Sequence, residues 1–150
     1  MPEAPAGAGD AQALAERCTH EMLSGDASRR LLDIELLLVS PGRARLAMTV
    51  RGDMVNGWGL CQGGLVSTLA DSAFAVACNT HGEVTVAAGF DVSFLESGRL
   101  GDRLVADARE VARRGRSGIY DVTVTRSADE AVLAEFRGRS RATGRPNPAA

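Results

Sequence analysis

Apolar and polar positions follow two different periods along the chain, and the changes of period predict its elements. Residues 10–23 carry apolar side chains at helical spacing, with Asp10 placed to cap the N-terminus of a helix. In "IYDVTVT", by contrast, Tyr120, Val122 and Val124 alternate with polar residues, a pattern typical of a half-buried antiparallel strand. Further extended runs, separated by turn signals, cover residues 31–39, 43–50, 85–96, 103–113 and 132–141.

A long, mostly apolar segment at residues 62–79 predicts a central helix between the second and third of these strands. Its polar residues Ser67, Thr68, Asp71 and Ser72 fall within about 140° of one helical face. Such a helix is covered by protein on most sides and faces something polar along one stripe. A helix, two strands, a central helix and then about four strands predict an α+β fold with an antiparallel sheet.

Nothing in the sequence marks a second domain, because it contains neither an internal repeat nor a linker. The 150 residues suit one domain that spans the chain, 1–150. The ends, at about residues 1–9 and 142–150, are rich in Pro, Ala and Gly, so we expect flexible tails there.

Composition excludes several classes of function. The net charge is −2, and all 17 basic residues are arginine, which argues against general nucleic-acid binding. No apolar stretch reaches the roughly 20 residues of a membrane helix, and the N-terminus lacks the pattern of a signal peptide, so we expect a cytoplasmic protein. The three cysteines have no CxxC spacing and the two histidines are isolated, so neither a disulfide framework nor a metal site is expected.

Asp71 is the unusual residue of the central segment. A buried carboxylate without a partner costs several kcal/mol or becomes protonated. Asp71 lies either on the polar surface stripe of an amphipathic helix or in an active site. Gly63 and Gly64, at the start of the same helix, allow close backbone approach, or they offer free N–H groups that serve as an oxyanion hole.

The stretch "NGWGLCQGGLVSTLADSAFAVACN" at residues 56–79 resembles the signature of the hotdog-fold acyl-CoA thioesterases. It is most similar to the phenylacetate-degradation (PaaI-like) branch, whose motif reads roughly "NG…CHGG…LADTAFAYACN". The stretches "GDRLVADAREVARRGRSGIYDVTV" and "AEFRGRSR" also resemble this branch, so the likeness covers most of residues 30–141.

This resemblance implies a hotdog fold, in which a curled antiparallel sheet wraps around the long central helix. It implies that Asp71 is the nucleophile or the general base that activates water. Gly63, alone or with Gly64, would donate its N–H to the thioester carbonyl, and Asn56 would position the water or the thioester. Gln62 departs from the pattern, which has His there; its amide can donate a hydrogen bond but cannot titrate.

The spacing of Gly63 and Asp71 adds a geometric constraint. Asp71 lies eight residues past Gly63, which is about 12 Å along a helix axis. A carboxylate side chain does not span that distance, so two groups that act on one carbonyl must come from different subunits. We therefore expect a homodimer with two shared sites, and the resemblance implies that dimers pair into a homotetramer.

Two further features have open interpretations. Arg113, Arg114 and Arg116 lie in a predicted turn between strands, where they hold the phosphates of coenzyme A or form a solvated basic turn. Trp58, in the loop before the helix, walls the acyl pocket or simply packs there.

The sequence thus predicts hydrolysis of an acyl-CoA thioester, an aryl or arylacetyl one such as hydroxyphenylacetyl-CoA, without a metal or redox cofactor. A thioesterase for other short- or medium-chain acyl-CoAs is the alternative within enzymes. A non-catalytic acyl-CoA-binding or pathway scaffold protein is the alternative outside them, because Gln62 replaces the family's His.

Overall fold

The computed structural model describes residues 7–150, and their elements follow the predicted order with two short additions. Helix α1 spans Ala8–Ser24, and the central helix α3 spans Gly63–Cys78. The strands are β1 (Glu35–Ser40), β2 (Arg43–Thr49), β3 (Glu83–Phe94), β4 (Arg103–Arg114), β5 (Ser117–Arg126) and β6 (Val132–Pro146). The additions are a short helix α2 (Ala27–Leu31) and a 3₁₀ turn η1 (Gly52–Met54).

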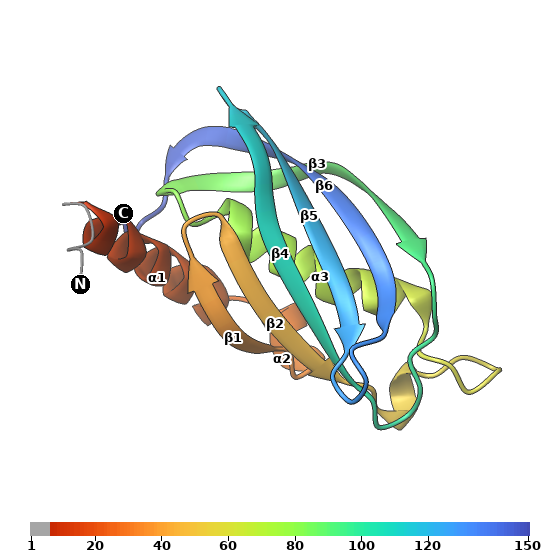
Figure 1. The fold of residues 1–150 in the computed structure, drawn as a ribbon. Helices are drawn as coiled ribbons and strands as arrows, with labels where there is room; N and C mark the ends of the chain where they lie inside the picture. Colours follow the sequence, from red (N-terminus) through yellow and green to blue (C-terminus); the bar gives the residue numbers. More distant parts are fainter. Residues whose placement is uncertain (1–6) are drawn as a thin grey trace, which may run out of the picture.

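The strands form a single sheet in the order β1-β2-β4-β5-β6-β3, and each neighbouring pair is antiparallel. The sheet is strongly twisted and curls around α3, which lies along one of its faces (Figure 1). The predicted α+β architecture, an antiparallel sheet curled around a central helix, is therefore confirmed. The sheet does not close, so β1 and β3 are its two edges.

The core lies between α3 and the sheet. The ring of Phe74 packs against Tyr120 at 5.6 Å and against Phe136 at 5.8 Å between ring centroids. Gly138 of β6 makes room for this ring, because a Cβ there would lie 2.8 Å from Phe74. Burial of a Phe side chain contributes about 1.5–3 kcal/mol relative to exposure, so the aromatic cluster anchors α3 to the sheet.

The predicted alternation of β5 is confirmed, since Tyr120, Val122 and Val124 are buried against α3. The helical spacing of residues 10–23 predicts an inward face of Leu14, Ala15, Cys18 and Met22. In α1, Ala15 and Cys18 are buried, and Leu14 and Met22 are half-buried. The pattern of apolar positions thus identifies both inward faces correctly.

Two expectations need correction. The strand predicted from residue 31 begins only at Glu35, because Asp26 caps α2 by accepting a hydrogen bond from the backbone N–H of Arg29. The C-terminal tail expected at 142–150 is in large part structured, since β6 continues to Pro146 and the next residue, Asn147, is buried. At the other end, α1 already includes residues 8 and 9, and residues 1–6 of the expected tail lie outside the described residues. The N-cap of α1 is Gly7, so Asp10 lies in the first turn of the helix and not at the predicted cap position.

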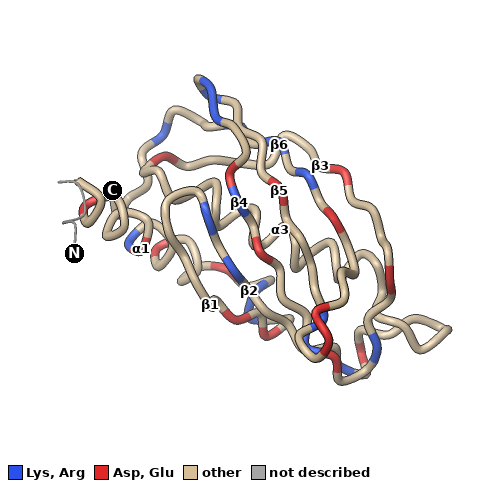
Figure 2. The backbone as a smooth tube through the Cα atoms, in the orientation of Figure 1, with Lys and Arg blue, Asp and Glu red and all other residues tan. Residues whose placement is uncertain are grey.

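Charged residues of both signs are interspersed along the strands (Figure 2). Many of them pair across neighbouring strands, as Arg137 of β6 does with Asp121 of β5 and Arg43 of β2 with Asp107 of β4. Within residues 7–150, no helix combines the length and apolar character that a membrane-spanning segment requires.

Candidate active site

The N-terminus of α3 presents unused backbone donors. Gly63 is the first residue of the helix, and the carbonyl of Gln62 accepts the N–H groups of Leu65 and Val66. The N–H groups of Gly63 and Gly64 find no acceptor within residues 7–150. Two free donors at the positive end of a helix dipole are suited to stabilise a negatively charged oxygen.

A hollow of about 180 Å³ adjoins these donors. It lies between the loop that precedes α3 and the segment that follows β3. The ring of Phe94, the last residue of β3, contacts Gly63, where a Cβ would approach it to 3.1 Å. Glycine at this position therefore keeps the helix terminus close to the strand. The lining residues are Asn56, Leu60, Cys61, Gly63, Val66, Phe94, Glu96, Ser97 and Gly98.

Asn56 shapes the loop at the edge of this hollow. Its side-chain oxygen accepts the backbone N–H groups of Trp58 at 2.9 Å and Leu60 at 3.1 Å. This turn, typical of Asn, uses the carbonyl end of the amide. The Nδ2 group has no acceptor within the described chain, so Asn56, which lines the hollow, keeps a free donor.

Asp71 lies in the middle of α3 and is half-buried. Within residues 7–150 its carboxylate forms neither a hydrogen bond nor an ion pair, and desolvation raises the pKa of this carboxyl group. Glu96, the acid that lines the hollow, is engaged differently, since its Oε1 accepts a hydrogen bond from Arg126 at 2.9 Å. Asp71 is therefore the carboxylate that is free to accept a proton or to attack.

The two halves of the predicted site are separated within one chain. Gly63 and Asp71 lie on one uninterrupted helix, so the rise per residue places them about 12 Å apart. Asp71 does not line the hollow next to Gly63. The structure thus brings Asn56 and Gly63 together and leaves Asp71 apart.

Neither Gln62 nor Trp58 lines this hollow. Gln62 immediately precedes α3, and its exposed side-chain amide has no partner within residues 7–150. The side chain of Trp58 is 87% exposed in the loop before α3 and does not form a wall of the hollow.

The arginines of the β4–β5 hairpin lie at the opposite end of α3. Arg113 and Arg116 line a small cavity together with Cys78, the last residue of the helix. Gly63 is fifteen residues away along α3, or about 22 Å. Arg114 is the last residue of β4 in the same hairpin. These side chains do not meet the Gly63 hollow of their own chain.

The sequence did not reveal the contribution of the segment after β3. Phe94, Glu96, Ser97 and Gly98 line the hollow, although they lie about thirty residues beyond Gly63 in the chain. Their spacing carries no motif, and contacts between distant segments bring them to the N-terminus of α3. β3 pairs with β6, and the backbone N–H of Cys61 donates to the carbonyl of Gly98 at 2.8 Å. No local signal could have identified them.

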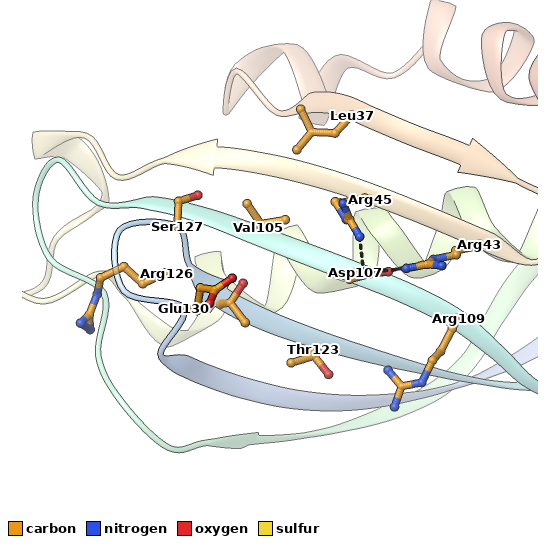
Figure 3. Close-up of a pocket in the computed structure, with 11 residues that line it drawn as sticks. Leu37, Arg43, Arg45, Val105, Asp107, Arg109, Thr123, Arg126, Ser127 and Glu130 are labelled. Atoms are coloured by element: carbon orange, nitrogen blue, oxygen red, sulfur yellow. Dashed lines mark hydrogen bonds and ion pairs between the residues drawn. The ribbon is translucent and has the colours of Figure 1, made fainter.

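A larger depression, of about 610 Å³, lies on the face of the sheet directed away from α3. Arg43 and Arg45 converge there on Asp107, at 3.1 and 3.0 Å (Figure 3). Because the sheet separates this depression from both Gly63 and Asp71, we do not assign the predicted chemistry to it. Nor does the part of the chain described here contain a group of three His, Cys, Asp or Glu side chains able to hold a metal ion.

Known protein families and characterised proteins include relatives of this chain. Residues 59–133 match the thioesterase superfamily. The chain is 38% identical to the acyl-coenzyme A thioesterase PaaI of Escherichia coli K12 over 125 residues, which cover 83% of this chain and 89% of that protein. A putative esterase of Archaeoglobus fulgidus is 32% identical over 119 residues, which cover 79% of this chain and 77% of that protein.

Solved structures give the same result. The E. coli PaaI protein from the phenylacetic acid degradation operon superimposes with a TM-score of 0.88 at 35% identity, covering 90% of this chain and 97% of that chain. A Streptococcus mutans UA159 protein bound to acetyl-CoA superimposes with a TM-score of 0.72 at 26% identity, covering 75% of this chain and 90% of that chain. The match of half the chain to the family and the identity to PaaI together show that this chain belongs to the thioesterase superfamily and has its hotdog fold.

Proposed function

We propose that this protein hydrolyses acyl-CoA thioesters with Asp71 as the catalytic carboxylate and the N-terminus of α3 as the oxyanion hole. The observation that carries this proposal is a half-buried carboxylate without a partner among the described residues, on the same helix as two free N–H donors. The similarity to an acyl-coenzyme A thioesterase over most of the chain supports it.

The chemistry assigns a separate task to each group. The N–H of Gly63, with that of Gly64, polarises the thioester carbonyl and stabilises the negative oxygen of the tetrahedral intermediate. Asp71 either attacks the carbonyl carbon or takes a proton from a water molecule that attacks it. Both routes consume one water and release a carboxylic acid and the CoA thiol. Both also require an ionised Asp71, so activity falls as pH falls through its raised pKa.

One chain does not assemble this site, and its open edge suggests how a second chain completes it. β3 pairs with β6 on one side only, and its other side is an edge of the sheet. Val86, Phe90 and Phe94 of this edge strand are 48, 41 and 51% exposed. A long edge strand with exposed apolar residues favours pairing with another chain.

We therefore place the two chains of a dimer edge to edge through β3, related by a twofold axis. The incompletely covered stripe of α3, which includes Gly64, Thr68 and Asp71, then faces the same stripe of the partner chain. In this arrangement, Asp71 of one chain faces Gly63 of the other. Pairing of two such dimers gives the proposed homotetramer.

We propose an aryl or arylacetyl group, such as hydroxyphenylacetyl, as the acyl part of the substrate. The hollow next to Gly63 has apolar walls from Leu60, Val66 and Phe94, and the partner chain would enlarge it. The similarity to a protein from a phenylacetic acid degradation operon supports this choice. Trp58, and the arginines of the hairpin (Arg113, Arg114 and Arg116), would contact the substrate from the neighbouring subunit.

The direct test is the release of free CoA thiol from a panel of thioesters. We expect the purified protein to hydrolyse arylacetyl-CoA faster than acetyl-CoA or hexanoyl-CoA. Faster hydrolysis of the aliphatic thioesters would support thioester hydrolysis but would contradict the proposed aryl or arylacetyl substrate. Binding of the thioesters without release of thiol would instead support the acyl-CoA-binding or scaffold alternative.

The variant Gln62→His tests the departure from the family pattern. Because the Gln62 amide is exposed and without a partner in the described chain, it can donate the hydrogen bond that a neutral His would donate. We expect a change in kcat of less than about tenfold, and an acidic limb that reflects Asp71 in both proteins. A Gln62→His protein about 100-fold faster than its parent would show that the position needs an acid, and would favour the binding alternative.

A further inference from the structure

A second cleft lies between α1, α2 and β1, away from the α3 site. These two helices lie beside β1, at the edge of the sheet opposite to β3 (Figure 1). The cleft has a volume of about 370 Å³, within the range of sites for small molecules. It shares no lining residue with the hollow next to Gly63.

The cleft has an apolar part and a polar part. Leu23 of α1 and both Leu36 and Val39 of β1 supply aliphatic walls. The remaining lining residues are Glu16, Thr19, His20, Ser24 and Arg29. Of these, Glu16, His20 and Ser24 are exposed, whereas Thr19 is buried and Arg29 is half-buried.

Two residues that line this cleft each carry a buried polar atom without a partner in the described chain. Thr19 is only 2% exposed, and its Oγ1 forms no hydrogen bond within the described residues. The Nε of Arg29 is also buried and without a hydrogen bond there. Each such group costs about 1–3 kcal/mol, so two of them that line one cleft are unusual for a finished core.

The charge of Arg29 is also uncompensated. Its guanidinium forms no ion pair within residues 7–150, although the backbone N–H of the same residue is bound to Asp26. Glu16, the acid that lines the cleft, accepts a hydrogen bond from the neutral amide of Gln12 at 2.8 Å and forms no ion pair with Arg29 within the described residues. The guanidinium of Arg29 is therefore available to a ligand.

We propose that this cleft binds a small monocarboxylate with an apolar tail. The carboxylate accepts hydrogen bonds from the guanidinium of Arg29 and the hydroxyl of Thr19, which provides the missing partners for both. The tail lies against Leu23, Leu36 and Val39. The bound acid thereby links α1 and α2 to β1. This proposal does not depend on the proposed hydrolysis, because the two sites use different residues.

Hexanoate is a suitable probe, with 1-hexanol as the uncharged control. In amide-detected NMR titrations of the full chain, hexanoate is expected to shift the signals of Thr19, His20, Ser24 and Arg29 in a saturable manner. Hexanol is expected to bind at least about tenfold more weakly, because it lacks the charge-assisted hydrogen bond. Hexanoate can also enter the α3 site, but shifts there involve other amides and are fitted separately.

Two variants and one control test the assignment. Arg29→Gln is expected to weaken binding at this cleft by about tenfold or more. Thr19→Val keeps the shape of the side chain and removes the hydroxyl, so it is expected to weaken binding without lowering the Tm. The matched control is Arg17→Gln, which removes the same charge from an exposed residue of α1 that does not line the cleft, and it should leave the affinity unchanged.

Thr19→Val keeps the proposal testable if Arg29→Gln fails to fold. Full hexanoate affinity in Thr19→Val, or equal affinities for hexanoate and hexanol, would overturn the assignment. Shifts confined to residues around Gly63 and Asp71 would also overturn it, since they would place all binding at the α3 site.

Discussion

Asp71→Asn is expected to lower the rate of thioester hydrolysis by about 100-fold or more, the scale of a lost general base. Asparagine preserves the size of the side chain but accepts no proton and is a poor nucleophile. The substrate affinity should change much less, because the N–H donors of α3 and the hollow next to them stay intact. Measurements of kcat by thiol release and of Kd with a non-hydrolysable thioether analogue separate the two effects.

Measuring the thermal stability of the same variant tests whether unfolding causes this loss of rate. Burial raises the pKa of Asp71, so the native state binds its proton more tightly than the unfolded state. At pH 7 the ionised carboxylate therefore destabilises the fold, and this cost disappears as pH falls below the unfolded pKa. Asp71→Asn is expected to raise the Tm at pH 7 by on the order of 2 °C, and to have no such advantage near pH 3.

Asp10→Asn, an exposed change of the same kind in the first turn of α1, is the control for the rate and should leave it unchanged. If Asp71→Asn instead kept the parental rate, the carboxylate would have no catalytic role. A fall in Tm at pH 7 would mean that Asp71 has a stabilising partner in the assembled protein.

The features that the sequence predicted well depend on local patterns. The period of α3, the alternation of β5 and the positions of Gly63 and Asp71 are all contained in short windows. Each window also indicates which of its residues are buried, because the apolar positions of a helix or a strand identify its inward face. The resemblance of residues 56–79 to a known signature added the chemical roles.

The C-terminal segment was mispredicted because its structure depends on distant partners. Ala142 and Pro146 pair with Thr85 and Glu83 of β3, a contact that Gly- and Pro-rich composition does not reveal. Asn147 is then fixed by its backbone N–H, which binds the carbonyl of Gly82 at 2.8 Å. Composition describes what a segment prefers in isolation, whereas pairing with a strand edge overrides that preference.

The site itself shows the same limit. Sequence placed Asn56, Gly63 and Asp71 in one motif, but it could not show that Phe94 contacts Gly63 across the sheet edge. Nor could it identify the cleft around Thr19 and Arg29, since these residues are brought together by the packing of α1 on β1 and by the unpredicted helix α2. The sequence pattern predicts the individual helices and strands, but it does not predict the contacts between them.

The N-terminus of α3 offers a substitution that removes one donor with little other change. Gly63→Pro deletes the N–H at the first helical position, where proline is well tolerated. The preceding residue, Gln62, has φ −57° and ψ 129°, a conformation compatible with a following proline. We expect a loss of about 100-fold in kcat, as for removal of one oxyanion-hole donor.

Gly63→Ala is the matched control for this loss. It introduces the same Cβ next to Phe94, 3.1 Å from the ring, but keeps the N–H. The alanine variant should therefore remain clearly more active than the proline variant. Equal losses in both would assign the effect to crowding against Phe94 rather than to the missing donor.

Coexpression of Asp71→Asn with Gly63→Pro then tests whether the site is shared between chains. In each variant alone, every site lacks one of the two groups, so about 1% of the parental activity or less is expected. In a mixed dimer with shared sites, the Asp71 of the Gly63→Pro chain meets the Gly63 of the Asp71→Asn chain, which restores one intact site. Random pairing of equal amounts makes half of the dimers mixed, so we expect about a quarter of the parental activity.

A site built within one chain predicts the opposite result, because every chain in the mixture then lacks one of its two groups. Mixing the two proteins after separate purification is the control, since stable dimers exchange no subunits and should stay inactive. Activity of the coexpressed pair no higher than that of the separate variants, with mixed dimers verified by two different affinity tags, would refute the shared site. Recovery to about a quarter would place Asp71 opposite Gly63 of its neighbour, as the 12 Å separation along α3 requires.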